Sequence, residues 1–327
     1  MIYLAPLEGL TTLVFRNAIN SIYGGIDKYY TPFLTVTHLK GKHLREVAPE
    51  NNIGMKVVPQ ILGNRPGEFI KLAQELKRLG YEEVNLNLGC PSGTVVKKGR
   101  GSGFLSFPEE LRKYLDEIFE KTDINISIKT RIGMNSTEDL PKILDVYKDF
   151  PISELTVHPR LGIDMYRGST NLCAFKECYD MAVSHNIPLV YNGDIVDIDS
   201  YLRIKSELKT LGIPEDYLDK MNIMIGRGLI MNPDLGNILS LNDLNKDEVK
   251  AKAEKIDKAK LKAFLAKLEE GYSADLYADK QRVMKFKELW NFMGTGLKIG
   301  DKNLKIILKA SSMAEYKNAV TMILSQI

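Results

Sequence analysis

The sequence predicts an α/β fold, a (β/α)8 TIM barrel followed by a small all-α helical domain. Eight short apolar runs recur along residues 1–242, and segments with helical spacing lie between them. Such near-continuous runs are typical of strands buried on both faces of a parallel sheet. A doubly wound open sheet is the competing topology, but eight near-regular units are more than most open sheets use. The runs are Ile2–Leu7, Lys28–Leu34, Met55–Leu62, Glu83–Cys90, Ile124–Gly133, Glu154–Arg160, Pro188–Asp194 and Asn222–Leu229.

The segments between the runs have the spacing of amphipathic helices. Pro66–Leu79 is followed by Gly80, a common residue just after a helix. Pro108–Lys121 and Glu138–Phe150 show the same pattern, so we expect helices there. The apolar stripe of the first segment consists of Phe69, Leu72, Ala73, Leu76 and Leu79.

Composition excludes several classes of protein. With 44% hydrophobic and 27% charged residues in 327, the chain is an ordinary globular protein rather than a disordered or collagenous one. No apolar run is long enough for a membrane helix, and the first residues show no basic leader, so we expect no membrane partner and no signal peptide. Three cysteines and four histidines build neither a disulfide framework nor a zinc ribbon. We therefore expect a cytoplasmic protein, most simply a monomer.

The regular pattern ends near residue 242, which divides the chain into a barrel domain, 1–242, and a helical domain, 243–327. The helical domain carries 17 Lys and Arg against 12 Asp and Glu, whereas the rest carries 28 against 30. Residues 246–271 are rich in Lys, Ala, Leu and Glu and predict one long helix. Further helices are expected at 278–293, 301–311 and 313–326. The basic surface belongs to the helical part.

Two strand ends predict a phosphate site. The loops after the seventh and eighth strands of such barrels commonly bind phosphate, and here they read YNGDI and IGRGL. Gly193, Gly226 and Gly228 let backbone N–H groups approach an anion, and Arg227 adds a charge-assisted contact. The alternative is that these are ordinary turn glycines beside a surface arginine.

Cys90 ends the fourth run, ahead of a glycine-rich basic loop. It is a small buried hydrophobe, a nucleophile, or a general acid above a bound cofactor. Gly99–Gly103 lacks the register of a P-loop, so we interpret the segment as a mobile basic loop. Lys129, Gln60 and His158 also lie at strand ends. Lys129 needs an anion or an electron-rich ring nearby, because an unpaired buried charge is costly.

Taken together, the motifs LAPLEG, QILG, NLNLGCPS with its basic glycine loop, IKTRIG, TVHPR, YNGDI and IGRG resemble the dihydrouridine synthase family. The resemblance covers essentially the whole chain in the family's order, and NLNLGCPS is its most specific part. It implies a flavoenzyme with an FMN-binding barrel and a helical C-terminal domain. One departure is His158-Pro159-Arg160-Leu161, where many members read H-[GA]-R-[TK]; proline removes an N–H there, which leaves the role of Arg160 open.

The resemblance implies reduction of uridine in tRNA to 5,6-dihydrouridine, with NADPH or NADH reducing the flavin. Cys90 matches the general acid that protonates C5 of uracil, while flavin N5 delivers hydride to C6. The residues that match flavin contacts are Ala5, Pro6, Leu7, Gln60, Lys129, His158, Asn192, Gly193, Asp194, Gly226 and Arg227. Those expected to face the uracil or the RNA are Asn87, Lys97, Lys98, Arg100, Arg131 and Arg167.

Binding of tRNA would explain the basic helical domain, because phosphate contacts dominate RNA affinity. The alternative is that these Lys-rich helices are merely solvated. The target uridine would have to leave the base stack. Two other functions remain. An FMN barrel acting on a free pyrimidine or enoate would not need the basic domain. A non-catalytic RNA-binding barrel would not need Cys90, Lys129 and Arg227 together.

Overall fold

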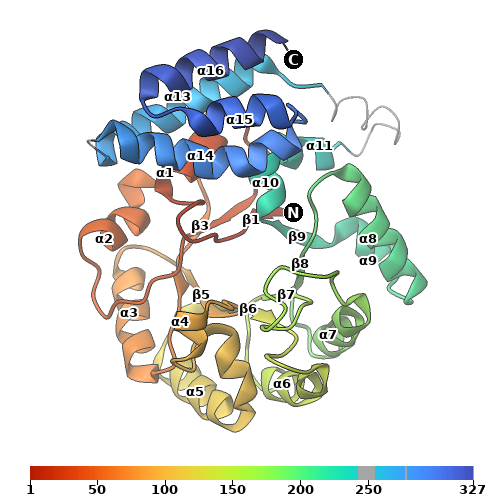
Figure 1. The fold of residues 1–327 in the computed structure, drawn as a ribbon. Coiled ribbons are helices and arrows are strands. Elements are labelled where there is room, and N and C mark those ends of the chain that lie inside the picture. Colours follow the sequence, from red (N-terminus) through yellow and green to blue (C-terminus); the bar gives the residue numbers. More distant parts are fainter. Residues whose placement is uncertain (242–254, 277, 327) are drawn as a thin grey trace.

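The computed structural model describes residues 1–241, 255–276 and 278–326. Within these residues, a parallel sheet of nine strands runs in the order β3-β2-β1-β9-β8-β7-β6-β5-β4, and helices surround it (Figure 1). The strands are β1 (Ile2–Leu4), β2 (Lys28–Tyr30), β3 (Val57–Val58), β4 (Gln60–Ile61), β5 (Glu83–Leu88), β6 (Asn125–Arg131), β7 (Leu155–His158), β8 (Leu189–Asn192) and β9 (Asn222–Ile225).

The two strands at the ends of this order, β3 and β4, are the halves of one predicted run. Pro59 separates them, and proline has no N–H to donate to a neighbouring strand. Val57 pairs with Tyr29 of β2, whereas Gln60 pairs with Asn85 of β5. The sheet therefore closes on itself through a single stretch of chain. This confirms the predicted barrel of eight β/α units and excludes the open sheet.

The helices on the outside of the barrel follow the predicted amphipathic segments. α3 begins at the proline of its segment and ends just before Gly80, whose φ of +94° favours glycine. The third expected helix is shorter than predicted, because a 3-10 turn at Thr137–Asp139 precedes it. The helices of the barrel are α1 (Leu13–Ile22), α2 (Gly41–Val47), α3 (Pro66–Arg78), α4 (Gly93–Val96), α5 (Pro108–Lys121), α6 (Leu140–Tyr147), α7 (Leu172–Ser184), α8 (Ile198–Thr210), α9 (Glu215–Lys220), α10 (Arg227–Met231) and α11 (Leu235–Leu239).

The N-terminal ends of the strands enclose a buried ionic cluster. Lys28, the first residue of β2, lies 3.1 Å from Glu83 and 3.0 Å from Glu154. Tyr3 and Tyr30 each donate a hydroxyl hydrogen bond to Glu154, at 2.8 and 3.0 Å. Every charge in this cluster has a partner, so this end of the barrel is closed by satisfied polar groups. No pattern in the sequence predicts this cluster.

Among the residues described after the barrel, 255–276 and 278–326, there are four helices: α13 (Lys258–Asp275), α14 (Asp279–Gly296), α15 (Asp301–Lys309) and α16 (Met313–Gln326). The predicted start of the long helix at 246 lies outside the described residues. Residues 255–257 are not helical, because the Asp257 side chain accepts from Lys260 N–H at 3.0 Å and begins the helix. Within residues 1–241, 255–276 and 278–326, the structure contains no helix with the length and apolar character that a bilayer span requires.

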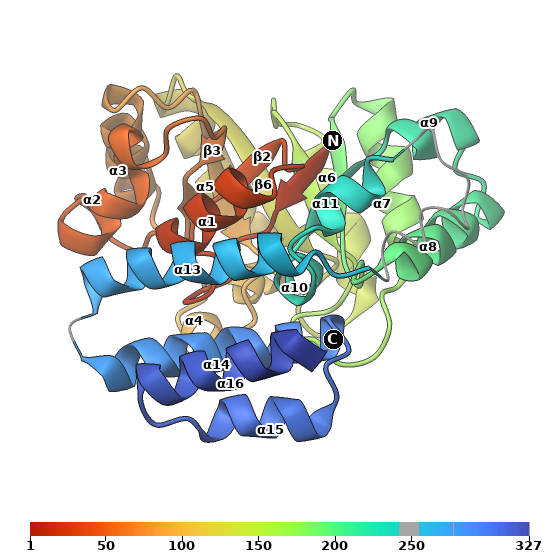
Figure 2. The same cartoon turned by 90° about the horizontal axis from the view of Figure 1, so that it is seen from above.

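The C-terminal helices pack tightly on the barrel. The rings of Phe15 in α1 and Phe264 in α13 meet edge to face at 5.8 Å. A Cβ at Gly271 would lie 2.5 Å from Val14, so only glycine lets α13 approach α1 this closely. α14 packs against α10, and Lys285 donates to the carbonyl of Gly9 in the loop after β1 at 3.2 Å. Figure 2 shows α14, α15 and α16 on the same side as α4 and α10, which follow strand ends. The basic helices thus flank the mouth of the barrel.

Candidate active site

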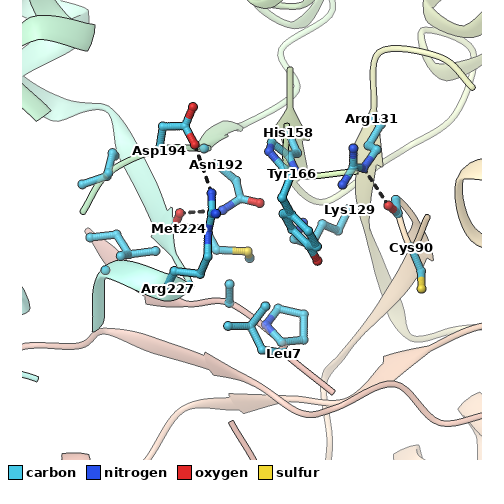
Figure 3. Close-up of a pocket in the computed structure, with 18 of the residues that line it drawn as sticks. Leu7, Cys90, Lys129, Arg131, His158, Tyr166, Asn192, Asp194, Met224 and Arg227 are labelled. Atoms are coloured by element: carbon cyan, nitrogen blue, oxygen red, sulfur yellow. Dashed lines mark hydrogen bonds and ion pairs between the residues drawn. The ribbon is translucent and has the colours of Figure 1, made fainter. Parts of the chain in front are cut away.

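A pocket of about 890 Å³, partly open to solvent, lies at the C-terminal ends of the strands (Figure 3). Residues at or just after the ends of β1, β2 and β5–β9 line it, which is where barrel enzymes place their chemistry. Thirteen predicted site residues meet here: Ala5, Pro6, Leu7, Asn87, Cys90, Lys129, Arg131, His158, Asn192, Gly193, Asp194, Gly226 and Arg227. Five do not line it in the described chain: Gln60, Lys97, Lys98, Arg100 and Arg167.

Cys90 is held at the pocket wall through its backbone. Its N–H donates to Oδ1 of Asn87 at 2.9 Å, and its carbonyl accepts from both N–H and Oγ–H of Ser102 at 3.0 Å. A Cβ at Gly101 would clash with that carbonyl at 2.5 Å, and Gly101 has a φ of +57°. Burial raises the pKa of the Cys90 thiol, and Arg131 and Lys129 oppose this effect in part. The sulfur is therefore a protonated thiol at neutral pH.

Gln60 acts through the residues around Cys90 rather than on the pocket itself. Its side chain is fully buried; Nε2 donates to Asn85 at 2.8 Å and Oε1 accepts from Asn87 Nδ2 at 2.7 Å. Asn85 in turn donates to Ser127 at 2.9 Å. This chain of amides crosses three strands and fixes the orientation of Asn87, whose other end holds Cys90 N–H. The flavin contact predicted for Gln60 stays a prediction that this arrangement does not display.

Lys129 is the charged group at the centre of the pocket. It lies on β6 and lines the pocket, and no hydrogen bond or ion pair is shown for its ammonium among the described residues. Burial, with a smaller contribution from the nearby Arg131, lowers its pKa from 10.5 to about 7. A buried ammonium without a partner is unfavourable, so the site is built to receive an anionic or electron-rich group.

Arg131 connects two loops of the mouth. It is 1% exposed, and Nε donates to the carbonyl of Gly89 at 2.9 Å, beside Cys90. Its two other nitrogens donate to the carbonyls of Leu161 and Met165, each at 2.6 Å. Because these hydrogen bonds join the Cys90 loop to the loop after β7, the side chain holds the mouth together. Contact with uracil remains a prediction.

The region predicted to bind phosphate contains a carboxylate shared by two arginines. Asp194 lies 2.5 Å from Arg160 and 3.1 Å from Arg227. Asn192 donates to the carbonyl of Met224 at 2.7 Å, which joins the ends of β8 and β9. Gly193 and Gly226 line the pocket beside them. The two loops therefore meet as expected, with Arg227 about one-third exposed and able to turn toward an incoming anion.

Tyr166 lines the pocket although no sequence pattern predicted it, as do Glu8 and Phe33. Its ring lies 5.6 Å from the guanidinium of Arg131 and 5.3 Å from that of Arg227, and Figure 3 shows it between them. It is 50% exposed, at the mouth of the pocket. The neighbouring Arg167, predicted to contact RNA, is exposed and donates to the carbonyl of Ile163 at 3.4 Å. No sequence pattern marks Tyr166, because its loop has no periodicity.

The basic loop after Cys90 is anchored to α3. Arg100 donates to Asn64 at 3.2 Å and forms an ion pair with Glu68 at 3.4 Å. Asn64 also donates to the carbonyl of Lys98 at 2.9 Å. The side chains of Lys97 and Lys98 are exposed. The loop thus presents two lysines to solvent, while Arg100 is engaged by the protein.

Comparison with known proteins identifies the family. Residues 3–313 match the sequence model described as dihydrouridine synthase (Dus). A probable tRNA-dihydrouridine synthase of Staphylococcus epidermidis is 28% identical over 237 residues, which cover 70% of this chain and 69% of that protein. The tRNA-dihydrouridine synthase B of Pasteurella multocida is 29% identical over 244 residues, covering 73% and 68%. Because the match extends over nearly the whole chain, this protein belongs to the dihydrouridine synthase family.

Proposed function

We propose that this protein is an oxidoreductase that reduces uridine in tRNA to 5,6-dihydrouridine, with FMN as cofactor and NADPH, or NADH, as reductant. The family and the names of the relatives support the reaction and the substrate. One observation carries the cofactor: Lys129 lines the pocket with its pKa lowered to about 7, and no hydrogen bond or ion pair of its ammonium is shown among the described residues. A cytoplasmic location and a monomeric state complete the proposal.

The residues of the pocket fit FMN. When bound, FMN supplies hydride from N5 to C6 of uracil. Lys129 would face the electron-rich edge of the flavin ring, which gives its charge the partner it lacks. Arg227, with Gly193 and Gly226, would hold the phosphate, and the backbone of Ala5–Leu7 would lie along the ring. These residues come from both sides of the same pocket, as a bulky polar cofactor requires.

Cys90 would act as the general acid. Its raised pKa keeps the thiol protonated at neutral pH, so a proton is available for C5 of uracil. Arg131 and Lys129 favour the charged form of the sulfur and would stabilise the thiolate that remains. Asn87 and Ser102 fix the backbone on both sides of Cys90, which keeps the sulfur at the pocket wall. The site would thus place a proton donor beside two cations that stabilise the thiolate left after the proton is transferred.

The RNA would approach the face on which the helices α14–α16 flank the mouth. A stripe of lysines on α15, spaced to lie on one face, is exposed and shows no ion pair among the described residues: Lys302, Lys305 and Lys309. By contrast, Lys267 in α13 is paired with Glu270 at 2.8 Å. We therefore expect α15 to supply phosphate contacts within the basic helical domain. A uridine turned out of the stack would enter beside Tyr166.

The first test is the visible spectrum of the purified protein, followed by mass analysis of any released cofactor. A flavin spectrum and the mass of FMN are expected; a colourless protein that takes up no added FMN would contradict the proposal. The second test measures dihydrouridine by mass spectrometry after incubation of the enzyme, NADPH and tRNA lacking the modification. No product with a flavin-loaded protein would exclude tRNA reduction and leave a small-molecule substrate.

A further inference from the structure

Arg160 follows β7 and holds several partners, although it is only 2% exposed. Its Nε donates to the carbonyl of Arg167 at 3.2 Å, and one Nη donates to the carbonyl of Gly168 at 2.6 Å and to Asp194 at 2.5 Å. Its other Nη lies 3.0 Å from Nε2 of His158. The last contact determines the chemistry of the histidine.

The contact between Arg160 and His158 decides which ring nitrogen carries the proton. A guanidinium has five N–H donors, no acceptor, and does not lose its proton in proteins. Nε2 of His158 must therefore accept this hydrogen bond with its lone pair. A neutral imidazole with Nε2 free of hydrogen carries its proton on Nδ1.

The surroundings of His158 keep its ring neutral. Burial lowers its pKa well below the usual value, and four cations add to this effect. They come from β6, from the end of β7 and from α10: Lys129, Arg131, Arg160 and Arg227. The nearby carboxylate of Asp194 is already shared by two of these arginines, and the ring of Tyr166 lies 6.3 Å away. A second proton on Nε2 would also break the hydrogen bond with Arg160.

The remaining nitrogen of the ring, Nδ1, lies on the edge away from Arg160. A Cβ at Gly193 would lie 3.3 Å from Cδ2 of His158, so the edge with Cδ2 and Nε2 packs against Gly193 and Arg160. Nδ1 lies on the other edge, His158 lines the pocket, and no protein partner of Nδ1 is shown in the described chain. Nδ1–H is thus the hydrogen that His158 presents to a bound molecule.

We propose that Arg160 is a positioning residue that fixes His158 as the neutral Nδ1–H tautomer, so that His158 donates a hydrogen bond to an acceptor atom of the bound cofactor. Only the identity of that cofactor rests on the proposed function. A neutral imidazole donates its N–H in a hydrogen bond but does not give up that proton at neutral pH. Proton transfer to the substrate is therefore left to Cys90. The departure at Pro159 does not remove Arg160 from the site.

The tautomer is measured directly on the cofactor-free full chain labelled with 15N-histidine. Two-bond 1H–15N spectra distinguish protonated from unprotonated ring nitrogens, and the chain has only four histidines. The His158 signal is assigned by its loss in His158→Asn. We expect protonated Nδ1 and bare Nε2 at neutral pH, and the same pattern in mildly acidic buffer. A protonated Nε2 would overturn the proposal.

The role of Arg160 is tested by its removal. In Arg160→Met the donor is gone, so the His158 spectrum should show Nε2–H and its pKa should rise; a pure Nδ1–H tautomer would exclude Arg160 as the cause. Circular dichroism checks that the variant folds. If it does not, Arg160→Lys takes its place. An ammonium is also a pure donor, so Nδ1–H must persist there, and Nε2–H would contradict the proposal.

FMN binding to the cofactor-free protein tests the donor role of His158, and quenching of flavin fluorescence measures the affinity. His158→Asn keeps an N–H near the position of Nδ1, whereas His158→Leu removes it. The Leu variant should bind FMN about tenfold more weakly than the wild type, and the Asn variant within about threefold of it. Equal affinity of both variants would exclude the donor role. If the wild type binds no FMN but shows Nδ1–H, the proposed function fails and the tautomer stands.

Discussion

The interior of the barrel contains a lysine at each end, and only one of the two is paired within the described residues. Lys28 at the N-terminal end lies between Glu83 and Glu154, with its ammonium 5.0 Å from the ring of Tyr3. Lys129 at the C-terminal end has no such partner in the described chain, and burial lowers its pKa to about 7. The first lysine is satisfied by the fold, whereas the second is left for a ligand.

This difference indicates which end of the barrel stabilises the protein and which end carries its chemistry. A charge that the fold pairs is costly to remove, since its loss leaves the partner buried and alone. A charge that the fold leaves unpaired lowers stability, and this cost is offset only when a ligand binds. Substitutions at the two ends should therefore have different effects. Those at the mouth should change binding or turnover, and those at the closed end should change the free energy of unfolding.

The largest expected effect is on turnover at the mouth. Cys90→Ala should reduce the rate of uridine reduction by about 10²–10⁴-fold, the usual contribution of a general acid, with FMN and tRNA binding retained. Its melting temperature should stay close to that of the wild type. Single-turnover kinetics with the reduced enzyme measure the rate. Cys173→Ala, at an exposed cysteine, is the control and should be unchanged. Full activity of Cys90→Ala would remove the thiol from the mechanism.

The next effect is on stability at the closed end. Lys28→Met leaves Glu83 and Glu154 buried without their cation, so the free energy of unfolding should fall by about 3–5 kcal/mol. Urea denaturation measures it. Lys262→Met, at an exposed position of α13, is the matched control and should stay within about 0.5 kcal/mol of the wild type. An unchanged Lys28→Met would show that the cluster does not stabilise the barrel.

Lys129→Met should raise the free energy of unfolding of the cofactor-free protein, whereas Lys28→Met should lower it. The folded pKa of about 7 lies below the value of 10.5 for an unperturbed lysine, so between these values the unfolded chain binds more protons. The stability of the cofactor-free wild type should therefore rise with pH in this window, by up to about 1.4 kcal/mol per pH unit, and the penalty is complete below pH 7. Lys129→Met should lack this rise and be more stable at neutral pH. Parallel urea titrations at several pH values compare the two proteins; a wild type with no such rise would mean that the ammonium is not desolvated.

The barrel was predictable because each of the eight β/α units begins with one apolar run, although the run at Met55–Leu62 forms two strands, β3 and β4. The same rule placed Cys90, Lys129 and Arg227 in one pocket. The closed end was not predictable, since Lys28, Glu83 and Glu154 are far apart in the chain and only ring closure brings them together.

Partners of side chains were equally hidden from the sequence. The sequence shows that Arg131 is charged. It does not show that the acceptors of its hydrogen bonds are backbone carbonyls of a loop without periodicity. Tyr166 belongs to the same loop, eight residues beyond the end of β7, where no pattern indicates which side chain turns inward. Gln60 was predicted from its place at a strand end, yet two neighbouring amides occupy its side chain.

The smallest expected effect extends the comparison to the helices beside the mouth. Lys305 on α15 is exposed and shows no ion pair in the described residues, so we expect it to be available for a phosphate. Lys317 on α16 is paired with Glu269 at 2.7 Å. Lys305→Ala should weaken tRNA binding severalfold and lower the slope of log affinity against log salt by about 1, because one phosphate contact is lost. Lys317→Ala should leave the slope unchanged. Filter binding across a salt series measures both, and equal slopes for the two variants would show that the lysine stripe of α15 is only a solvated surface.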